Sequence, residues 1–370
     1  MRYFLSSGEA SGEASAVALA ERIRQYDSDA RFEGIGASAM RSAGIALWRD
    51  HTGWASMGPA AAIPRIPKLL AAMLRTAAHL NTTRPDLLIL VDFGVFNLRL
   101  ARQLRRIGYD GAILDVFPPG TWLDDEEKAR RVSEVAIPVT AFAHQRDFYR
   151  GLGCRIEFFG HPLTGRYAKR PLRRPAPGDG GVVAMLPGSR TGELRRHVPL
   201  LLDAFAALRR LRPNAAGRFA AADARAEARI ARAIAQRNAA NVSIERGVAQ
   251  VLEAADGAWV ASGTAVLETA LIGVPAVAIY VIPPALIWYG KRMIKHRFIT
   301  LPNLVLGREV VPELLQDAAT PDALAAALDR LMNDPSEQLR AFDEMRDALG
   351  PPDALDRCAQ FAVSLARGAT

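Results

Sequence analysis

Short apolar runs alternate with helix-like segments along almost the whole chain, and this alternation constrains the fold more than any other feature. The clearest run is Leu87–Asp92, where an acid ends an unbroken apolar stretch. A strand buried on both faces of a parallel sheet has this pattern. Strands that alternate with helices build parallel sheets covered by helices, so we predict an α/β fold.

The alternation occurs twice, in residues 1–165 and again in residues 181–345. Between the arrays, residues 163–181 are rich in Pro, Gly and Arg, which is typical of a linker. We therefore predict two Rossmann-like, doubly wound domains that face each other across a cleft. The expected strands are Arg2–Ser6, Arg31–Ile35, Leu87–Asp92, Ala112–Phe117, Val135–Thr140, Arg155–Phe159, Val182–Leu186, Arg218–Ala222, Val242–Arg246, Ala258–Ala261 and Pro275–Ile282.

The residues that follow each strand are the candidates for chemistry, because parallel sheets bind ligands at the carboxyl ends of their strands. Gly8 and Gly12 follow the first strand and would let a ligand approach the backbone, although a Gly/Ser turn needs no ligand. Asp92 follows the apolar run, where a carboxylate can act as a general base or cap the next helix. Both interpretations of Asp92 stay open from this pattern.

Two strand ends in the second array have the pattern of anion sites. At Gly188–Arg190, helix amides and a fixed cation would meet a phosphate. Ser262–Thr264 repeat the arrangement, and Glu268, one helical turn further, is placed to grip a ribose diol. The alternatives are a solvated arginine and a surface carboxylate. Asn303 and His161 are candidates that also fit a helix cap and a structural imidazole.

The net charge of +8 is unevenly distributed. Residues 60–110 are strongly basic, and Lys291, Arg292, Lys295 and Arg297 add a second cluster. Such stretches indicate an anionic partner, namely a phosphorylated metabolite or an acidic membrane surface, or they are solvated helix faces. Neither stretch has a known nucleic-acid-binding motif, so we do not expect nucleic-acid binding.

Neither the first residues nor the longest uncharged stretch predicts a membrane segment. The N-terminal apolar run is too short for a signal peptide. Thr269–Gly290 carries no charge, but its glycine and prolines would break a spanning helix. Cys154 and Cys358 fit two free thiols in a reducing compartment, and a single disulfide is the alternative. These features predict a cytoplasmic protein.

Eight segments, in this order, resemble the lipid-A-disaccharide synthase family, inverting glycosyltransferases of the two-domain GT-B fold. Almost the whole chain is covered, and the last segment is long and specific. The segments are Ser6–Glu13, ARFEGIGASAM at 30–40, MG at 57–58, Asp92–Asn97, FFGHPL at 158–163, LPGSR at 186–190 with Glu193, ASGTAVLE at 261–268 and KRMIKHRFITLPNLVLGREVVPELLQ at 291–316.

The resemblance implies transfer of 2,3-diacylglucosamine from its UDP conjugate to 2,3-diacylglucosamine 1-phosphate, giving the lipid A disaccharide 1-phosphate and UDP. It implies that Asp92 deprotonates the acceptor 6-hydroxyl, and that no metal or cofactor is needed. The implied substrate- and UDP-binding residues are Gly8, Glu9, Ser11, Gly12, Asn97, Ser189, Arg190, Ser262, Gly263, Thr264, Glu268 and Asn303. Residues 346–370 would complete the first domain, and both a monomer and a homodimer fit.

One amphipathic stretch is similar to a family segment that lies on the membrane and accepts acyl chains. Its apolar residues recur at helical spacing, with Arg65, Lys68 and Arg75 between them; ordinary core packing is the alternative. The residues expected to contact membrane or acyl chains are Ile63, Ile66, Leu69, Leu70 and Met73. The protein would then be peripheral on the inner face of the cytoplasmic membrane.

The first domain departs from the family pattern at three places. Around Trp122 the family's basic segment is replaced by acids at 124–127, which would repel an acceptor phosphate if they faced it. The first loop has Ala10 and Glu13 at variant positions, and the Asp92–Asn97 segment lacks the usual Pro and acid. Two alternatives follow, a GT-B enzyme for another UDP-sugar or lipid acceptor, and a non-catalytic nucleotide- or membrane-binding paralogue.

Overall fold

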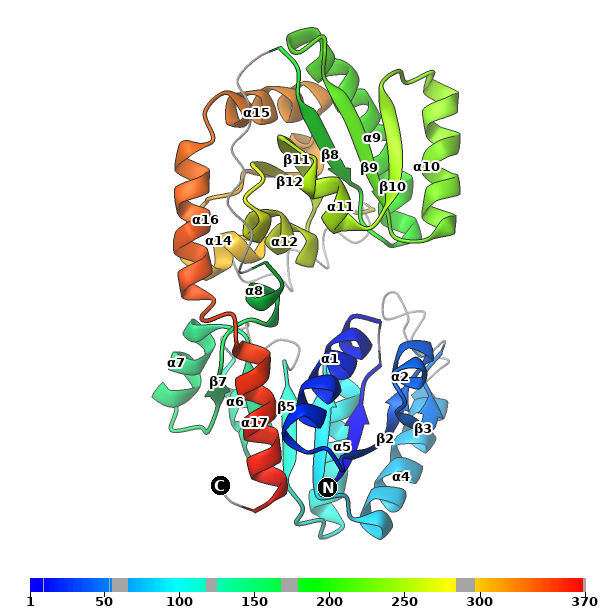
Figure 1. Cartoon of the computed structure of the whole chain (residues 1–370), viewed down its shortest axis with the longest axis vertical. Helices are drawn as coiled ribbons and strands as arrows, with labels where there is room; N and C mark the ends of the chain where they lie inside the picture. Colours follow the sequence, from blue (N-terminus) through cyan, green and yellow to red (C-terminus); the bar gives the residue numbers. More distant parts are fainter. Residues whose placement is uncertain are drawn as a thin grey trace. The chain divides into compact units, whose positions relative to one another are not determined.

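The computed structural model describes residues 1–8, 10–52, 54, 66–117, 125–167, 179–283 and 297–368. The side chains of residues 10 and 11 are outside this description. The chain forms two compact units, one made of Met1–Arg166 with Leu349–Thr370 and the other of Tyr167–Ala348. Each unit is a parallel β-sheet covered by helices (Figure 1), which confirms the predicted α/β class.

The first sheet has the strand order β3-β2-β1-β4-β5-β6-β7, with all neighbours parallel. Its strands are β1 (Arg2–Ser6), β2 (Arg31–Gly36), β3 (Ala46–Asp50), β4 (Leu87–Val91), β5 (Ile113–Val116), β6 (Ile137–Thr140) and β7 (Glu157–Phe158). Because the order reverses between β1 and β4, their carboxyl ends form the switch point at which such sheets bind ligands.

Helices cover both faces of the first sheet. These helices are α1 (Ala10–Tyr26), α2 (Ser38–Ser42), α4 (Ile66–Thr83), α5 (Gly94–Arg106), α6 (Glu126–Ser133), α7 (Ala143–Gly151) and α17 (Ala354–Ala366). A short helix, α8 (Pro162–Tyr167), follows β7 and ends at the first residue of the second unit. One core joins α1 and α17 to Ile89 and Val91 of β4, and another joins α4 and α5 to Leu88 and Leu90. Strand β4 is therefore buried on both faces, as its unbroken apolar run predicts.

The second sheet has the order β10-β9-β8-β11-β12-β13, again entirely parallel. Its strands are β8 (Val182–Leu186), β9 (Ala216–Ala221), β10 (Val242–Arg246), β11 (Gly257–Ala261), β12 (Ala276–Tyr280) and β13 (Glu313–Leu315). Its helices are α9 (Thr191–Leu211), α10 (Ala224–Arg237), α11 (Val248–Glu253), α12 (Thr264–Ile272), α14 (Leu301–Leu306), α15 (Pro321–Asn333) and α16 (Ser336–Ala348). Here the order reverses between β8 and β11.

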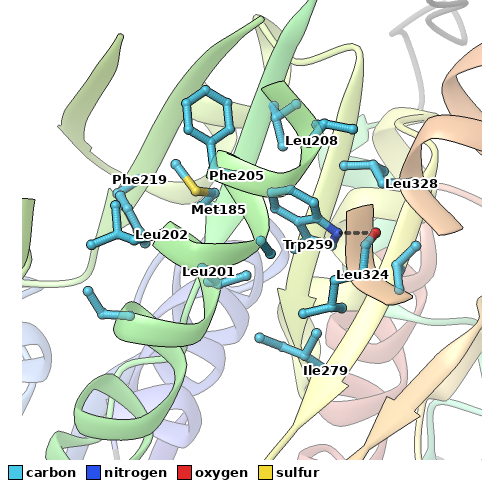
Figure 2. Close-up of a cluster of buried hydrophobic side chains, with 14 of the residues drawn as sticks. Met185, Leu201, Leu202, Phe205, Leu208, Phe219, Trp259, Ile279, Leu324 and Leu328 are labelled. Atoms are coloured by element: carbon cyan, nitrogen blue, oxygen red, sulfur yellow. Dashed lines mark hydrogen bonds between the residues drawn. The ribbon is translucent and has the colours of Figure 1, made fainter. Parts of the chain in front are cut away.

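The core of the second unit surrounds Trp259 of β11 (Figure 2). Its side chain is fully buried, and the indole Nε1 donates a hydrogen bond to the carbonyl oxygen of Leu324 at 3.1 Å. Phe205 of α9 and Leu328 of α15 belong to the same cluster. Helices from both ends of the unit's sequence are thus joined to one central strand, which holds the carboxyl ends of β8 and β11 in place.

The sequence pattern misses two strands, β3 and β13. In β3 the residues alternate between exposed and half-buried, and in β13 all three are half-buried. Edge strands of this kind lack the apolar run that marks a buried strand. Both cysteines are free thiols, with Cys358 buried and Cys154 half-buried. Within the described residues, no helix is long and apolar enough to cross a membrane.

Candidate functional site

The switch point of the first sheet brings Gly8, Gly12 and Asp92 together. Strands β1 and β4 pair with Ser6 opposite Leu90, so the segments after them are neighbours. A Cβ on Gly12 would lie 3.2 Å from the Cβ of Asp92, and one on Gly8 would overlap the ring of Phe93. A Cβ at position 8 would force the Phe93 ring to move, and one at position 12 would crowd Asp92. Glu9 and the Ser11 side chain lie outside the described residues.

Gly12 lies in the first turn of α1, where the family resemblance implied a loop. Glu13 follows it and is buried, with Oε1 accepting hydrogen bonds from the backbone N–H groups of Ala37 and Met40 at 2.8 Å each. Glu13 therefore holds the start of α2 against α1. Its role at this end of the sheet is structural.

Asp92 is not the residue that caps α5, because the N-cap position is Phe93. Its own φ is 35°, in the left-handed region that non-glycine residues rarely adopt. Backbone strain of this kind persists only where the surrounding structure enforces it, and it is frequent at functional sites. The N-cap position contradicts the helix-cap interpretation of Asp92, and its role as a general base stays a prediction.

Asn97 ties the end of β1 to α5. It is buried, its Oδ1 accepts a hydrogen bond from Ser6 Oγ at 2.7 Å, and its Nδ2 donates to the Ser6 carbonyl oxygen at 3.3 Å. Both ends of the amide are therefore engaged by the chain. Any effect of Asn97 on a substrate would be exerted through the position of Ser6.

Sequence reasoning missed a second carboxyl at this edge, that of Asp115 in β5. Asp115 is only 4% exposed, and it is the one acid in an otherwise apolar strand. Burial, and secondly the charge of Asp92, raise the pKa of Asp115 to about 7. The signal in the sequence was an acid within the run ILDV, where a solvated side chain is not expected.

At the switch point of the second sheet, Gly188–Arg190 follow β8 and Ser262–Thr264 follow β11. Strands β8 and β11 pair with Leu186 opposite Val260, so these segments are neighbours. Arg190 is the N-cap of α9 and its side chain is exposed. The helix N-termini and the guanidinium group are an arrangement that suits a phosphate.

Glu193 holds the Gly188–Arg190 turn. Its Oε2 accepts a hydrogen bond from the backbone N–H of Arg190 at 3.2 Å, and its Oε1 lies 3.4 Å from the guanidinium Nη1. Gly188 has a φ of 92°, and a Cβ there would lie 2.3 Å from Glu193 Oε2. A side chain at position 188 would therefore disturb both the turn and the carboxylate that fixes it.

His197 supports the same turn from behind. It is fully buried, with Nδ1 2.8 Å from the Pro187 carbonyl oxygen and Nε2 accepting from the Val281 N–H at 3.0 Å. Since Nε2 is an acceptor, the proton lies on Nδ1 and the ring is neutral. Burial lowers the pKa of His197, in agreement with this tautomer. No motif marked this residue.

Gly263 and Thr264, at the start of α12, are exposed, and no side chain caps the helix. Ser262 Oγ donates a hydrogen bond to the Ile299 carbonyl oxygen at 3.2 Å. Glu268 is half-buried, and the hydroxyl of the buried Tyr167 lies 3.3 Å from its Oε2. Glu268 is thus an oriented carboxylate rather than a solvated one, as a ribose-binding residue would require.

Asn303 is fully buried and all of its hydrogen-bonding positions are occupied by the chain. Its Oδ1 accepts from the N–H groups of Val310 and Val311, at 2.7 and 2.8 Å. Its Nδ2 donates to the Val311 carbonyl oxygen at 2.8 Å and to Glu313 Oε1 at 2.9 Å. A direct contact with UDP stays a prediction, and these bonds favour an indirect one.

His161 fits the structural interpretation. It is buried, and its Nδ1 accepts a hydrogen bond from the Leu163 N–H at 3.1 Å. Burial lowers the pKa of His161 to about 4, so the ring is neutral in ordinary conditions. A neutral imidazole that caps its own turn needs no ligand.

Helix α4 turns part of its predicted stripe outward and part inward. Ile66 and Leu70 are exposed, and Leu74 continues their line one turn further. Met73 is buried and Leu69 packs against the same core, so these two residues do not belong to the exposed stripe. The fifth predicted residue, 63, lies outside the described chain.

The acids of the variant segment are paired within α6. Asp125 caps the helix by accepting from the Lys128 N–H at 3.1 Å, and acids also suit the positive end of a helix dipole. The exposed Glu126 and Glu127 form ion pairs with Arg130 and Arg131, one turn further. Asp124 lies outside the described residues. The charges from Asp125 onward are therefore balanced locally, which weakens the expected repulsion of a phosphate.

Comparison with known proteins decides the family. The protein-family model described as lipid-A-disaccharide synthetase matches residues 3–350 of this chain. The chain belongs to the lipid-A-disaccharide synthase family. A relative of that name from Pseudomonas aeruginosa (strain UCBPP-PA14) is 32% identical over 99% of this chain and 98% of its own length. Another from Myxococcus xanthus (strain DK1622) is 32% identical over 98% and 97%.

Solved structures share the fold of this lipid-A-disaccharide synthase family member at low identity. The UDP-GlcNAc 2-epimerase of Neisseria meningitidis bound to UDP-GlcNAc has a TM-score of 0.62 at 9% identity, covering 98% of this chain and 100% of that chain. A kitacinnamycin glycotransferase has a TM-score of 0.60 at 17% identity, covering 98% of both. These likenesses bear on the fold alone and agree with the predicted GT-B class.

Proposed function

We propose that this glycosyltransferase moves 2,3-diacylglucosamine from UDP-2,3-diacylglucosamine to 2,3-diacylglucosamine 1-phosphate, releasing UDP. The full-length relatives are named lipid-A-disaccharide synthases, and the motif resemblance implies these two substrates. The observation that carries it here is the close packing of Gly12 against Asp92 at the switch point of the first sheet. This packing fixes Asp92 at the carboxyl ends of β1 and β4, where parallel sheets bind their ligands.

In the proposed mechanism, Asp92 takes the proton of the acceptor 6-hydroxyl. The hydroxyl oxygen then attacks the anomeric carbon of the donor, and the bond to the UDP oxygen breaks with inversion. Gly8 and Gly12 allow the chain to pack closely against Phe93 and Asp92, and Asn97 holds Ser6 at the end of β1. Glu9 and Ser11 stay predicted donor-side residues.

The second unit would bind UDP. Arg190 and the start of α12 would meet the negative charge that develops on the diphosphate, without a metal ion. Ser189, Ser262, Gly263 and Thr264 surround this position on the two strand ends. Glu268, oriented by Tyr167, would accept hydrogen bonds from the ribose hydroxyls. Asn303 would act by fixing the segment that Ser262 contacts.

We propose that α4 holds the protein against the inner face of the cytoplasmic membrane. The exposed Ile66 and Leu70 would enter the interface, while Lys68 and Arg75 would face anionic headgroups. An Ile66→Glu/Leu70→Glu variant should lose binding to vesicles that contain anionic lipid. The matched control is Leu211→Glu, which alters a similarly exposed residue of the other unit and should leave vesicle binding unchanged.

The reaction is tested by UDP release from the two lipid substrates. Asp92→Asn should lower kcat by about 100-fold or more with donor binding retained, as expected for loss of a general base. Glu268→Gln should instead raise the KM for the donor. The control Asp110→Asn changes an exposed acid of the first unit and should leave both constants unchanged.

Unchanged turnover in Asp92→Asn would remove Asp92 as the base. UDP binding without product from this lipid pair, but with turnover of another acceptor, would favour the related-enzyme alternative. UDP and vesicle binding without any turnover would favour the non-catalytic alternative. The local pairing of Asp125, Glu126 and Glu127 weakens the related-enzyme alternative, which their charges motivated.

A further inference from the structure

We propose that Asp115 is a positioning residue that acts through Asp92, so that ionisation of the buried Asp115 carboxyl strengthens Asp92 as a base. This inference rests on the proposed role of Asp92 in glycosyl transfer. Asp115 itself need not touch a substrate.

The two acids lie at the ends of adjacent strands. In the register of β4 and β5, Leu90 is opposite Asp115, and Asp92 follows Leu90 by two residues. The backbone N–H of Asp92 donates to the carbonyl oxygen of Val116 at 3.3 Å, so the strands stay together beyond their last pair. Leu88, Leu90 and Ile113 share one core, which assigns Asp115, two residues after Ile113, to that sheet face.

The backbone is held in an unusual conformation just beyond both strands. Asp92 has a φ of 35°, and Phe117, two residues after Asp115, has a φ of 56°. Neither residue is a glycine, so both conformations cost free energy that the fold must supply. The two carboxyl groups are therefore set by an enforced geometry and not by free loops.

Asp115 lacks the partners that usually accompany a buried carboxyl group. It is 4% exposed, and among the described residues its pKa is set by burial and by the charge of Asp92, with no cation and no hydrogen bond among the causes. A buried acid kept only for stability would be neutralised by a cation or by backbone amides. The charge that acts on Asp115 is instead that of another carboxylate, Asp92.

The consequence is a pair of carboxyls that titrate together. The pKa of Asp115, raised by burial and by Asp92 to about 7, leaves it protonated in mild acid and ionised in mild base. When ionised, its negative charge makes proton uptake by Asp92 more favourable, which strengthens the base. Among the described residues, the Asp115 charge also acts on Tyr149 of α7, whose pKa is raised first by burial and then by that charge, so Tyr149 stays neutral.

Proton and electron pairs balance in the step that is affected. The acceptor hydroxyl gives its proton to Asp92, its oxygen forms the new bond to the anomeric carbon, and the UDP oxygen leaves with the bonding pair. Asp92 loses its negative charge when it takes the proton. The negative charge of ionised Asp115 repels that charge and therefore favours the step. Two carboxylates in one site shift each other's proton affinity strongly, so we expect about a tenfold gain in kcat.

The test is the dependence of kcat on pH in the full-length protein. Wild type should gain about tenfold between about pH 6 and about pH 8, whereas Asp115→Asn should be flat at the lower level. Tyr149→Phe is the matched control, because it removes a buried hydroxyl beside Asp115 and no charge. Its profile should keep the wild-type rise.

An infrared titration of the wild-type and Asp92→Asn proteins provides a second measurement that needs no change at Asp115. A protonated-carboxyl band should disappear near neutral pH in wild type, and at lower pH in Asp92→Asn. The inference would be overturned if kcat of Asp115→Asn rose with pH as in wild type. It would also be overturned if the band disappeared at the same pH in wild type and Asp92→Asn. The proposed function is tested separately, by the turnover of Asp92→Asn. Neither of these two results would change that test.

Discussion

Asn303→Ala should destabilise the second unit severely while acting on UDP only indirectly. The substitution removes two donors and one shared acceptor, and it leaves the buried N–H groups of Val310 and Val311 without their partner. At about 1 kcal/mol for each of the four hydrogen bonds, the expected loss is about 4 kcal/mol. That is a large fraction of the roughly 5–15 kcal/mol that stabilises a typical domain.

Asn303→Asp separates the contribution of the hydrogen bonds that the side chain accepts from that of the hydrogen bonds it donates. An aspartate keeps an oxygen for the N–H groups of Val310 and Val311 but loses both donors, and it places a second negative charge beside Glu313. About half of the loss, roughly 2 kcal/mol, should remain near neutral pH. It should shrink in acid as the added carboxyl is protonated.

Chemical denaturation followed by tryptophan fluorescence measures the loss, and calorimetric titration with UDP measures binding by the folded protein. Asn214→Ala is the control, since Asn214 is exposed in the same unit and makes a single side-chain bond, to Asp179. It should cost well under about 1 kcal/mol. If Asn303→Ala kept its unfolding free energy but lost UDP affinity tenfold, Asn303 would be a ligand contact and the reasoning would fail.

Three further predictions concern the two switch points. Between about pH 4 and pH 7 the folded chain keeps a proton on Asp115 that the unfolded chain, with the ordinary pKa of 3.8, releases. The free energy of unfolding should therefore fall by about 4 kcal/mol across that range relative to Asp115→Asn. The same pH dependence of the unfolding free energy in both proteins would contradict this. Gly12→Ala places a Cβ 3.2 Å from that of Asp92 and should lower kcat about tenfold with UDP affinity unchanged in calorimetry. Gly188→Ala, at a φ of 92°, should destabilise by about 1–3 kcal/mol and weaken UDP binding, and equal UDP affinity in the variant would refute the assigned role of this turn.

Local pattern was enough to predict the α/β class and most strands. The strands Val182–Leu186 and Val242–Arg246 have the expected bounds, because alternating apolar runs and turn residues mark strand ends directly. The pattern also identified the residues after β1, β4, β8 and β11 as candidates. It could do so because ligand positions in parallel sheets follow from strand direction alone.

Pairing between distant strands decided the rest. Only the order of β4 and β5 places Asp115 beside Asp92, and no spacing in the sequence encodes that neighbour. Burial and hydrogen bonding likewise showed that Asn97 and Asn303 are occupied by the chain. The sequence alone does not distinguish a polar residue that binds a ligand from one that stabilises the fold, because the partners of its side chain come from elsewhere in the chain.

Amphipathic spacing and charge runs show the same division. Helical periodicity identified the stripe on α4, but the packing against α5 determined that Met73 turns inward and Leu74 outward. The acids near residue 125 were visible as a charge run, and their neutralisation by Arg130 and Arg131 depends on their forming one helix.

Composition and periodicity thus specify the elements and their ends, which are local properties of the backbone. Which side chains meet, and with what charge and burial, depends on contacts between residues far apart in the chain, and these exist only once both sheets have formed.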